Sequence, residues 1–78
     1  MIKLDKHTNP SLSLINSVGV IIQELKEKKI VSYEELLGIL QRELSDSIKE
    51  IYPYALSFLY LLGKVEYLNN IDALRLLE

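Results

Sequence analysis

The chain has 78 residues, a formal net charge of −2, one histidine and no cysteine. These counts exclude a disulfide framework, a thiolate metal site and a site built from several histidines. The small negative charge gives no support for a nucleic-acid partner or an anionic membrane surface. A chain of this length forms one domain that buries only about 60% of the surface exposed in its unfolded state. We therefore expect a single domain over residues 1–78.

No apolar run approaches the roughly 18 residues that a membrane-spanning helix needs. The first ten residues also lack the apolar stretch of a signal peptide. We therefore expect a cytoplasmic protein with no membrane partner. Patterning divides the domain into a lead-in over 1–9, a helical part over 10–63 and a hairpin over 64–78.

The first helix is predicted from Pro10 to about Lys28. Before it, the lead-in alternates apolar and charged residues, which is typical of an edge strand. Asn9 followed by Pro10 is a helix-start signal, with asparagine as the cap. Gly19 predicts the close approach of another element, because a glycine in mid-helix costs about 1 kcal/mol. One broad apolar face is formed by Leu14, Ile15, Val18, Ile21, Ile22 and Leu25.

The middle of the chain predicts a short strand and two further helical segments. Ile30-Val31 is long enough only for a β-bridge or the start of a turn. Ser32 and Glu35 form a capping box, which opens a helix that extends to about Leu44. Pro53 interrupts the next segment, so we expect a helical turn over 47–52 and a helix over 53–62 with Gly63 as its C-cap. The inner face of the second helix is predicted to hold Leu36, Leu37, Leu40 and Leu44.

The stretch from Ser47 to Gly63 is the most apolar part of the chain. At about 100° per residue, its core side is formed by Ile48, Ile51, Tyr52, Ala55, Leu56, Leu59 and Leu62. Further apolar residues widen this side to roughly 220°, more than contact with one core requires. We therefore predict a partner interface at Tyr54, Phe58, Leu61 and Tyr60. The alternative is that the first or second helix covers these side chains.

After Gly63 the apolar period changes from 3.6 to 2, which predicts a β-hairpin. A four-residue loop over 69–72 would set Glu66 opposite Arg75 and so pair opposite charges across the strands. The same register sets Tyr67 opposite Leu74 and Val65 opposite Leu76. Asn69-Asn70 is predicted to supply the positive φ of the turn.

These elements occur in the order helix, strand, helix, helix and hairpin. That order is typical of an α+β, mostly helical fold, the winged helix-turn-helix, with three helices and a C-terminal β-hairpin wing. Ile30-Val31 would then pair with the wing. The alternative is a three-helix bundle with a frayed tail, against which the alternation after Gly63 argues.

The residues show no nucleophile–base pair, no glycine-rich phosphate loop and no metal-ligand cluster. We therefore expect no enzymatic activity, no cofactor and no metal. His7 is interpreted as a surface residue or local cap in preference to a phosphate ligand or a partner contact. Between Ser32 and Gly63, five acidic residues outnumber two basic ones. The net charge of this segment therefore has the wrong sign for binding DNA phosphates. A protein-interaction adaptor is therefore preferred to a DNA-binding transcriptional regulator or a purely homodimeric module.

Four blocks of sequence also resemble a known family: Lys6–Pro10, Val18-Gly19, Ile30–Leu36 and Ala55–Tyr67. Together they are similar to the small middle component of ABC three-component systems, which are bacterial conflict systems predicted to act in anti-phage defence. The resemblance implies a winged-helix adaptor without catalytic residues. It also implies an ABC-type ATPase and an effector subunit as partners, while a homodimer remains open.

Overall fold

The computed structural model describes residues 10–77, so the expected lead-in strand and the Asn9 cap lie outside the described residues. The predicted order of elements is confirmed, and so is the predicted α+β, mostly helical class. The arrangement is consistent with a winged helix. The elements are α1 (Pro10–Lys28), β1 (Ile30–Ser32), α2 (Tyr33–Glu43), the 3₁₀ turn η2 (Asp46–Glu50), α3 (Tyr52–Leu61), β2 (Val65–Leu68) and β3 (Ala73–Leu76).

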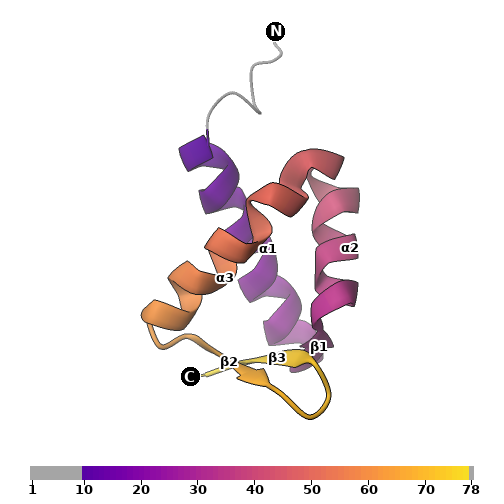
Figure 1. The fold of residues 1–78 in the computed structure, drawn as a ribbon, viewed down its shortest axis with the longest axis vertical. Helices are drawn as coiled ribbons and strands as arrows, with labels where there is room; N and C mark the ends of the chain where they lie inside the picture. Colours follow the sequence, from indigo (N-terminus) through magenta and orange to yellow (C-terminus); the bar gives the residue numbers. More distant parts are fainter. Residues whose placement is uncertain (1–9, 78) are drawn as a thin grey trace, which may run out of the picture.

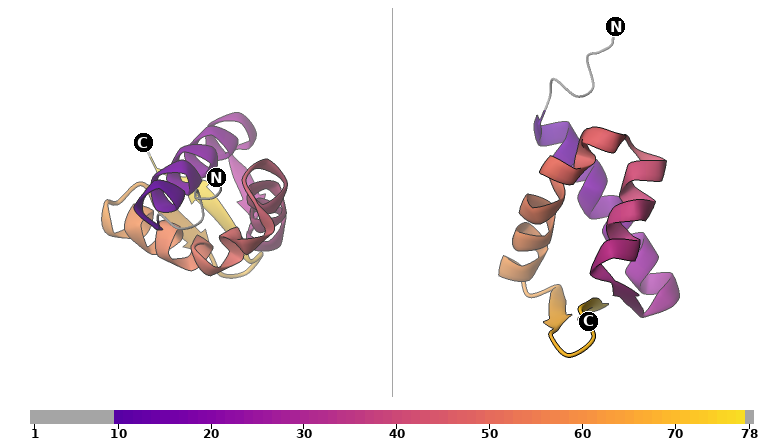
Figure 2. Two further views of the ribbon diagram at one scale, coloured as in Figure 1. Left: turned by 90° about the horizontal axis from the view of Figure 1, so that it is seen from above. Right: turned by 45° about the vertical axis from the view of Figure 1, so that its right-hand side comes forward.

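The helices fill the upper part of the view and the small sheet lies at its lower end (Figure 1). α1 packs against both α2 and α3. η2 joins α2 to α3, and from this joint the two helices diverge toward the sheet (Figure 2). The C-terminal half of α3 and the N-terminal end of α2 therefore both lie next to the hairpin.

The N-terminus of α2 is capped by Ser32. Its hydroxyl accepts a hydrogen bond of 3.1 Å from the Glu35 N–H, which confirms this half of the predicted capping box. The Glu35 carboxylate lies 3.7 Å from Lys28 Nζ, so the side chain contacts the end of α1 instead of reaching back to its own cap.

α3 ends in a Schellman motif. The Gly63 N–H donates to the Tyr60 carbonyl at 3.0 Å, and the Lys64 N–H donates to the Leu59 carbonyl at 2.9 Å. Gly63 has φ +72, a left-handed conformation that glycine adopts without steric cost. The predicted C-cap is confirmed, and the motif turns the chain directly from α3 into β2.

On α1, the predicted apolar face is only partly correct. Ile21 and Leu25 are fully buried, but Ile15 is exposed. Gly19 is exposed as well, and a Cβ built on it would meet nothing within 4 Å. The prediction that another element approaches Gly19 closely is therefore wrong, because α1 turns this position toward solvent.

The sheet has three antiparallel strands in the order β1-β3-β2. The predicted hairpin register and its loop over 69–72 are both confirmed. Across the strands, the Arg75 guanidinium lies 3.0 Å from the Glu66 carboxylate. The positive φ falls on Asp72 (φ +50) and not on Asn69-Asn70. Asp72 is held there because its carbonyl accepts a 3.0 Å hydrogen bond from the Tyr33 N–H.

The core joins one face of each helix to the sheet. Leu59 is 1% exposed, as expected of a central residue, but Leu56 is only half-buried. Leu62 was expected on the core side and is exposed, because the Schellman motif has already turned the chain outward there. The buried cluster consists of Ile21, Leu25, Val31, Leu36, Leu40, Ile48, Tyr52, Ala55, Leu59, Val65 and Leu74.

Candidate protein-binding surface

The outer side of α3 is apolar and exposed. The helix carries no charged residue, and Tyr54 and Leu61 are 69% and 84% exposed. Phe58 and Tyr60 are 45% and 64% exposed. Within residues 10–77, neither α1 nor α2 covers these side chains, in contrast to the alternative considered from the sequence.

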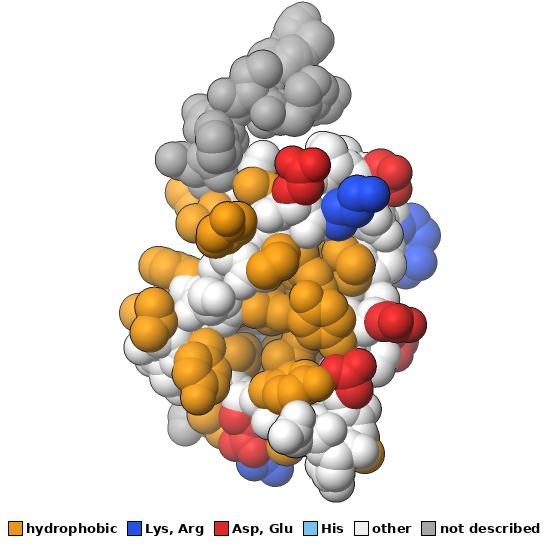
Figure 3. All heavy atoms as spheres, in the orientation of Figure 1, with side chains coloured by type: hydrophobic (Ala, Val, Ile, Leu, Met, Phe, Trp, Pro, Cys, Tyr) orange, Lys and Arg blue, Asp and Glu red, His pale blue; other side chains and the backbone are white. Residues whose placement is uncertain are grey.

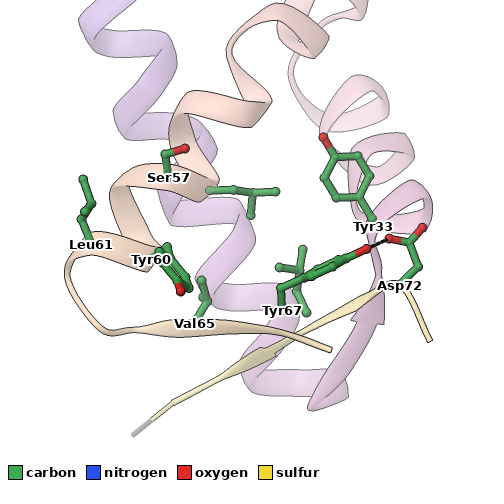
Figure 4. A pocket seen from close by; sticks show the side chains of 9 residues that line it. Tyr33, Ser57, Tyr60, Leu61, Val65, Tyr67 and Asp72 are labelled. Atoms are coloured by element: carbon green, nitrogen blue, oxygen red, sulfur yellow. Dashed lines mark hydrogen bonds between the residues drawn. The ribbon is translucent and has the colours of Figure 1, made fainter. Parts of the chain in front are cut away.

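These four residues occupy two parts of the surface. Tyr54, Phe58 and Leu61 follow one another at helical spacing, i, i+4 and i+7, and form what we call the α3 row. Tyr60 and Leu61 line a groove that Tyr54 and Phe58 do not reach. Leu61 belongs to both parts and lies at the outer end of the groove (Figure 4).

The groove has a volume of about 700 Å³ and lies between α3, the start of α2 and the hairpin. Hydrophobic side chains gather over α3 and this hollow, and charged side chains lie mostly at the margin (Figure 3). The lining residues are Tyr33, Leu56, Ser57, Tyr60, Leu61, Val65, Tyr67, Asp72 and Leu74.

The divergence of α2 and α3 leaves this hollow open above the sheet. Leu56 is only half-buried because it faces the groove and not the centre of the core. Val65 and Leu74 are buried in the sheet beneath it. Tyr33 and Tyr67 form the wall opposite α3 (Figure 4).

Asp72 is the one charged residue in the described lining of the groove. Its carboxylate accepts a hydrogen bond from the Tyr67 hydroxyl. This bond raises the pKa of Tyr67, because it stabilises the protonated phenol beside a carboxylate. The Tyr67 hydroxyl therefore stays neutral at pH 7, and the groove presents apolar surface, hydroxyl groups and a single negative charge.

From the sequence, Tyr52 and Tyr67 are expected to be core residues with their hydroxyls at the surface, and the structure contradicts one part of this expectation for each residue. Tyr67 was expected in the core, but its ring is exposed because it lies across the groove toward Asp72. The Tyr52 hydroxyl was expected at the surface, but it donates a 2.8 Å hydrogen bond to the Tyr33 carbonyl in the interior. Burial raises the pKa of Tyr52 above its ordinary value, and nearby Tyr33 and Asp72 add to the shift.

The sequence prediction did not include the other seven residues that line the groove, namely Tyr33, Leu56, Ser57, Val65, Tyr67, Asp72 and Leu74. One signal was present, because five tyrosines are many for 78 residues. Three of them, Tyr33, Tyr60 and Tyr67, line this hollow. Their common position depends on the divergence of α2 and α3, which periodicity does not reveal.

The exposed side of α3 carries no positive charge. A winged helix that reads DNA presents polar and basic side chains from its third helix, and α3 has neither lysine nor arginine. On the hairpin, Arg75 is paired with Glu66.

In residues 10–77 there is also no group of three or more acidic or histidine side chains that could hold a metal ion. None of the helices described is long and apolar enough to cross a membrane.

Fold and surface thus define a small helical domain with a C-terminal antiparallel sheet and an exposed apolar face. Residues 29–77 match the family model described as ABC-three component (ABC-3C) system Middle Component 8. The chain belongs to this family of middle components, as the resemblance predicted. The match includes the blocks Ile30–Leu36 and Ala55–Tyr67, but neither Lys6–Pro10 nor Val18-Gly19. No curated protein and no solved structure shows significant similarity to the chain.

Proposed function

We propose that this chain is a non-catalytic adaptor that binds a protein subunit of its three-component system through the α3 row. Membership of the family implies protein partners, because a middle component acts within a multi-component system. The observation that supports α3 as the contact is its exposed apolar surface without any charge.

The α3 row has the features of an interface centre. Aromatic residues are enriched in such centres, and a few of them carry most of the binding free energy. Tyr54 and Phe58 are one turn apart on the exposed side of α3, an arrangement by which a helix offers an apolar edge to another protein. Ser57 and Glu50 are also exposed and would lie at the polar rim.

The proposed partners are the ABC-type ATPase and the effector subunit of a bacterial conflict system that acts against phage, in the cytoplasm. Self-association through the same uncharged row is a second mode of binding, because no like charges would meet between two copies of α3. A regulator that binds DNA is the competing function, and the acidic balance of the helical part argues against it.

The test is co-purification of the chain with the proposed ATPase and effector subunits. Phe58→Asp should abolish capture, since it places a charge at the centre of the row, while far-UV circular dichroism stays unchanged. Ile71→Asp is the matched control, because Ile71 is exposed on the hairpin loop and outside the row. Equal capture by both variants, with intact fold, would refute the α3 row as the interface.

A further inference from the structure

β2 is an outer strand of the sheet. It pairs with β3 on one side, and within residues 10–77 no strand pairs with its other edge. An open edge of this kind presents unpaired N–H and C=O groups to which another strand can bind. β2 is the open edge whose side chains contribute to the groove.

The ladder between β2 and β3 determines which amides face this edge. The Leu77 N–H donates to the Lys64 carbonyl at 2.6 Å, in the same register as the pairs Val65↔Leu76 and Glu66↔Arg75. Hydrogen-bonded and non-hydrogen-bonded pairs alternate along an antiparallel ladder. The backbone of Glu66 therefore bonds to β3, and the N–H and C=O groups of Val65 and Tyr67 point to the other edge. Val65 is 3% exposed and Tyr67 46% exposed, so Tyr67 is the residue of the two at which this edge is accessible.

Val65 and Tyr67 are also the two residues of β2 that line the groove. A residue of an added antiparallel strand that bonds to Tyr67 would lie directly opposite it, with its side chain on the same face of the sheet. Alternate side chains of such a strand would therefore enter the groove above β2 (Figure 4).

The polar groups of the groove restrict what those side chains can be. Leu56, Val65 and Leu74 offer apolar surface, and Asp72 supplies a negative charge with no basic residue in the described lining to neutralise it. Tyr67 spans the distance between β2 and Asp72. A lysine or arginine opposite Tyr67 would thus extend along its ring to the carboxylate, whereas a phosphate or a carboxylate would be repelled.

We propose that the β2 edge and the groove together bind an extended segment of a partner protein by strand addition. Its alternate apolar side chains fill the groove, and a basic side chain pairs with Asp72. The proposal rests on the proposed adaptor function but uses a different surface, because Tyr54 and Phe58 do not line the groove.

The test uses the full chain, labelled with ¹⁵N, and a capped octapeptide that alternates valine with threonine and carries one lysine among its groove-facing residues. In NMR titrations, the Tyr67 amide should shift most and exchange its hydrogen more slowly. The amides of Glu66 and Leu68, already bonded to β3, should change less. No shift at millimolar peptide would overturn the proposal.

Two controls separate the strand contacts from the charge contact. A peptide that is N-methylated on the residues facing β2 should lose binding, because it cannot donate to the edge. Asp72→Asn should weaken binding of the lysine peptide about fivefold, or roughly 1 kcal/mol. It should leave binding of a peptide with norleucine in place of the lysine unchanged. Asparagine tolerates the positive φ of Asp72, so the loop should persist. Equal binding of the methylated peptide would refute strand addition.

Other occupants give distinct results, each of which overturns the proposal. Tighter binding of an oligothymidylate at the same tyrosines would indicate a single-stranded nucleic acid. A Tyr67 shift that depends on protein concentration without peptide would indicate a second copy at this edge, whereas self-association through the α3 row would shift Tyr54 and Phe58. Phe58→Asp should keep its affinity for the peptide, so loss of partner capture in that variant tests the adaptor function separately from this site.

Discussion

The Tyr52 hydroxyl donates a 2.8 Å hydrogen bond to the Tyr33 carbonyl, and the two rings lie 4.9 Å apart at 51°. The Tyr33 N–H in turn donates to the Asp72 carbonyl at 3.0 Å. The backbone of one residue at the start of α2 thus connects the start of α3 to the hairpin loop. These two bonds hold together the elements that surround the groove.

Tyr52→Phe should lower the free energy of unfolding by about 1–3 kcal/mol. The substitution keeps the buried ring but removes the hydroxyl, so the Tyr33 carbonyl loses its side-chain donor in the interior. Urea unfolding followed by circular dichroism measures the change. Tyr54→Phe is the control, because its exposed hydroxyl should contribute less than about 0.5 kcal/mol.

Alkaline pH should destabilise the protein through Tyr52. Its folded pKa lies above the ordinary value of 10.0, so the unfolded chain ionises first and releases protons that the folded chain keeps. Stability is therefore intact below about pH 10 and falls as pH rises above it. The difference in unfolding free energy between the unsubstituted protein and Tyr52→Phe should shrink between pH 9 and 11 in urea titrations. A constant difference across this range would contradict the assignment.

Leu59→Ala should cost about 2–5 kcal/mol, because Leu59 is buried among α1, α3 and the sheet. Leu61→Ala removes the same atoms from a largely exposed site on the same helix, and should change stability by less than about 0.5 kcal/mol. Thermal unfolding of the two variants measures the contrast. Similar melting temperatures would mean that the helical register of α3 is wrong.

Replacing two glycines by alanine should have opposite effects. Gly19→Ala should stabilise the protein by about 1 kcal/mol, since the site is exposed in mid-helix and the added methyl meets nothing within 4 Å. Gly63→Ala should destabilise it by about 1–2 kcal/mol, because alanine at φ +72 is strained although space is available. Chemical denaturation of both variants tests this, and destabilisation by Gly19→Ala would show a contact at that position.

Double-stranded DNA should bind no more tightly than the micromolar range of non-specific contact at about 150 mM salt. α3 lacks basic residues, and Arg75 is paired with Glu66. Fluorescence anisotropy with labelled duplexes measures this affinity. A nanomolar complex that resists salt would favour the regulator over the adaptor.

The sequence predicted the parts of the fold that depend on local rules. Pro10, Ser32 and Gly63 mark helix ends by capping chemistry, and the charge pair Glu66–Arg75 selects the hairpin register. Positions decided by the angles between helices were not predictable in this way. Gly19 was assigned to a close contact that the orientation of α1 does not make. Leu56 was assigned to the core, but the divergence of α2 and α3 leaves it only half-buried.

The same limit applies to the binding surface. The excess apolar arc of α3 was visible in the sequence, and its residues are exposed. The sequence did not show that this arc divides into the α3 row and one side of the groove, because Tyr33 and Tyr67 on the other side come from distant segments. The hydrogen bonds from Tyr33 to Asp72 and from Tyr67 to Asp72 bring these segments together.

The absence of charge on α3 also determines how fast a complex can form there. Long-range attraction accelerates encounters between oppositely charged surfaces, whereas surfaces without it associate at about 10⁵–10⁶ M⁻¹s⁻¹. An uncharged helix offers no such steering. A complex assembled on α3 therefore forms at this basal rate, nearly independent of ionic strength, and owes its lifetime to slow dissociation.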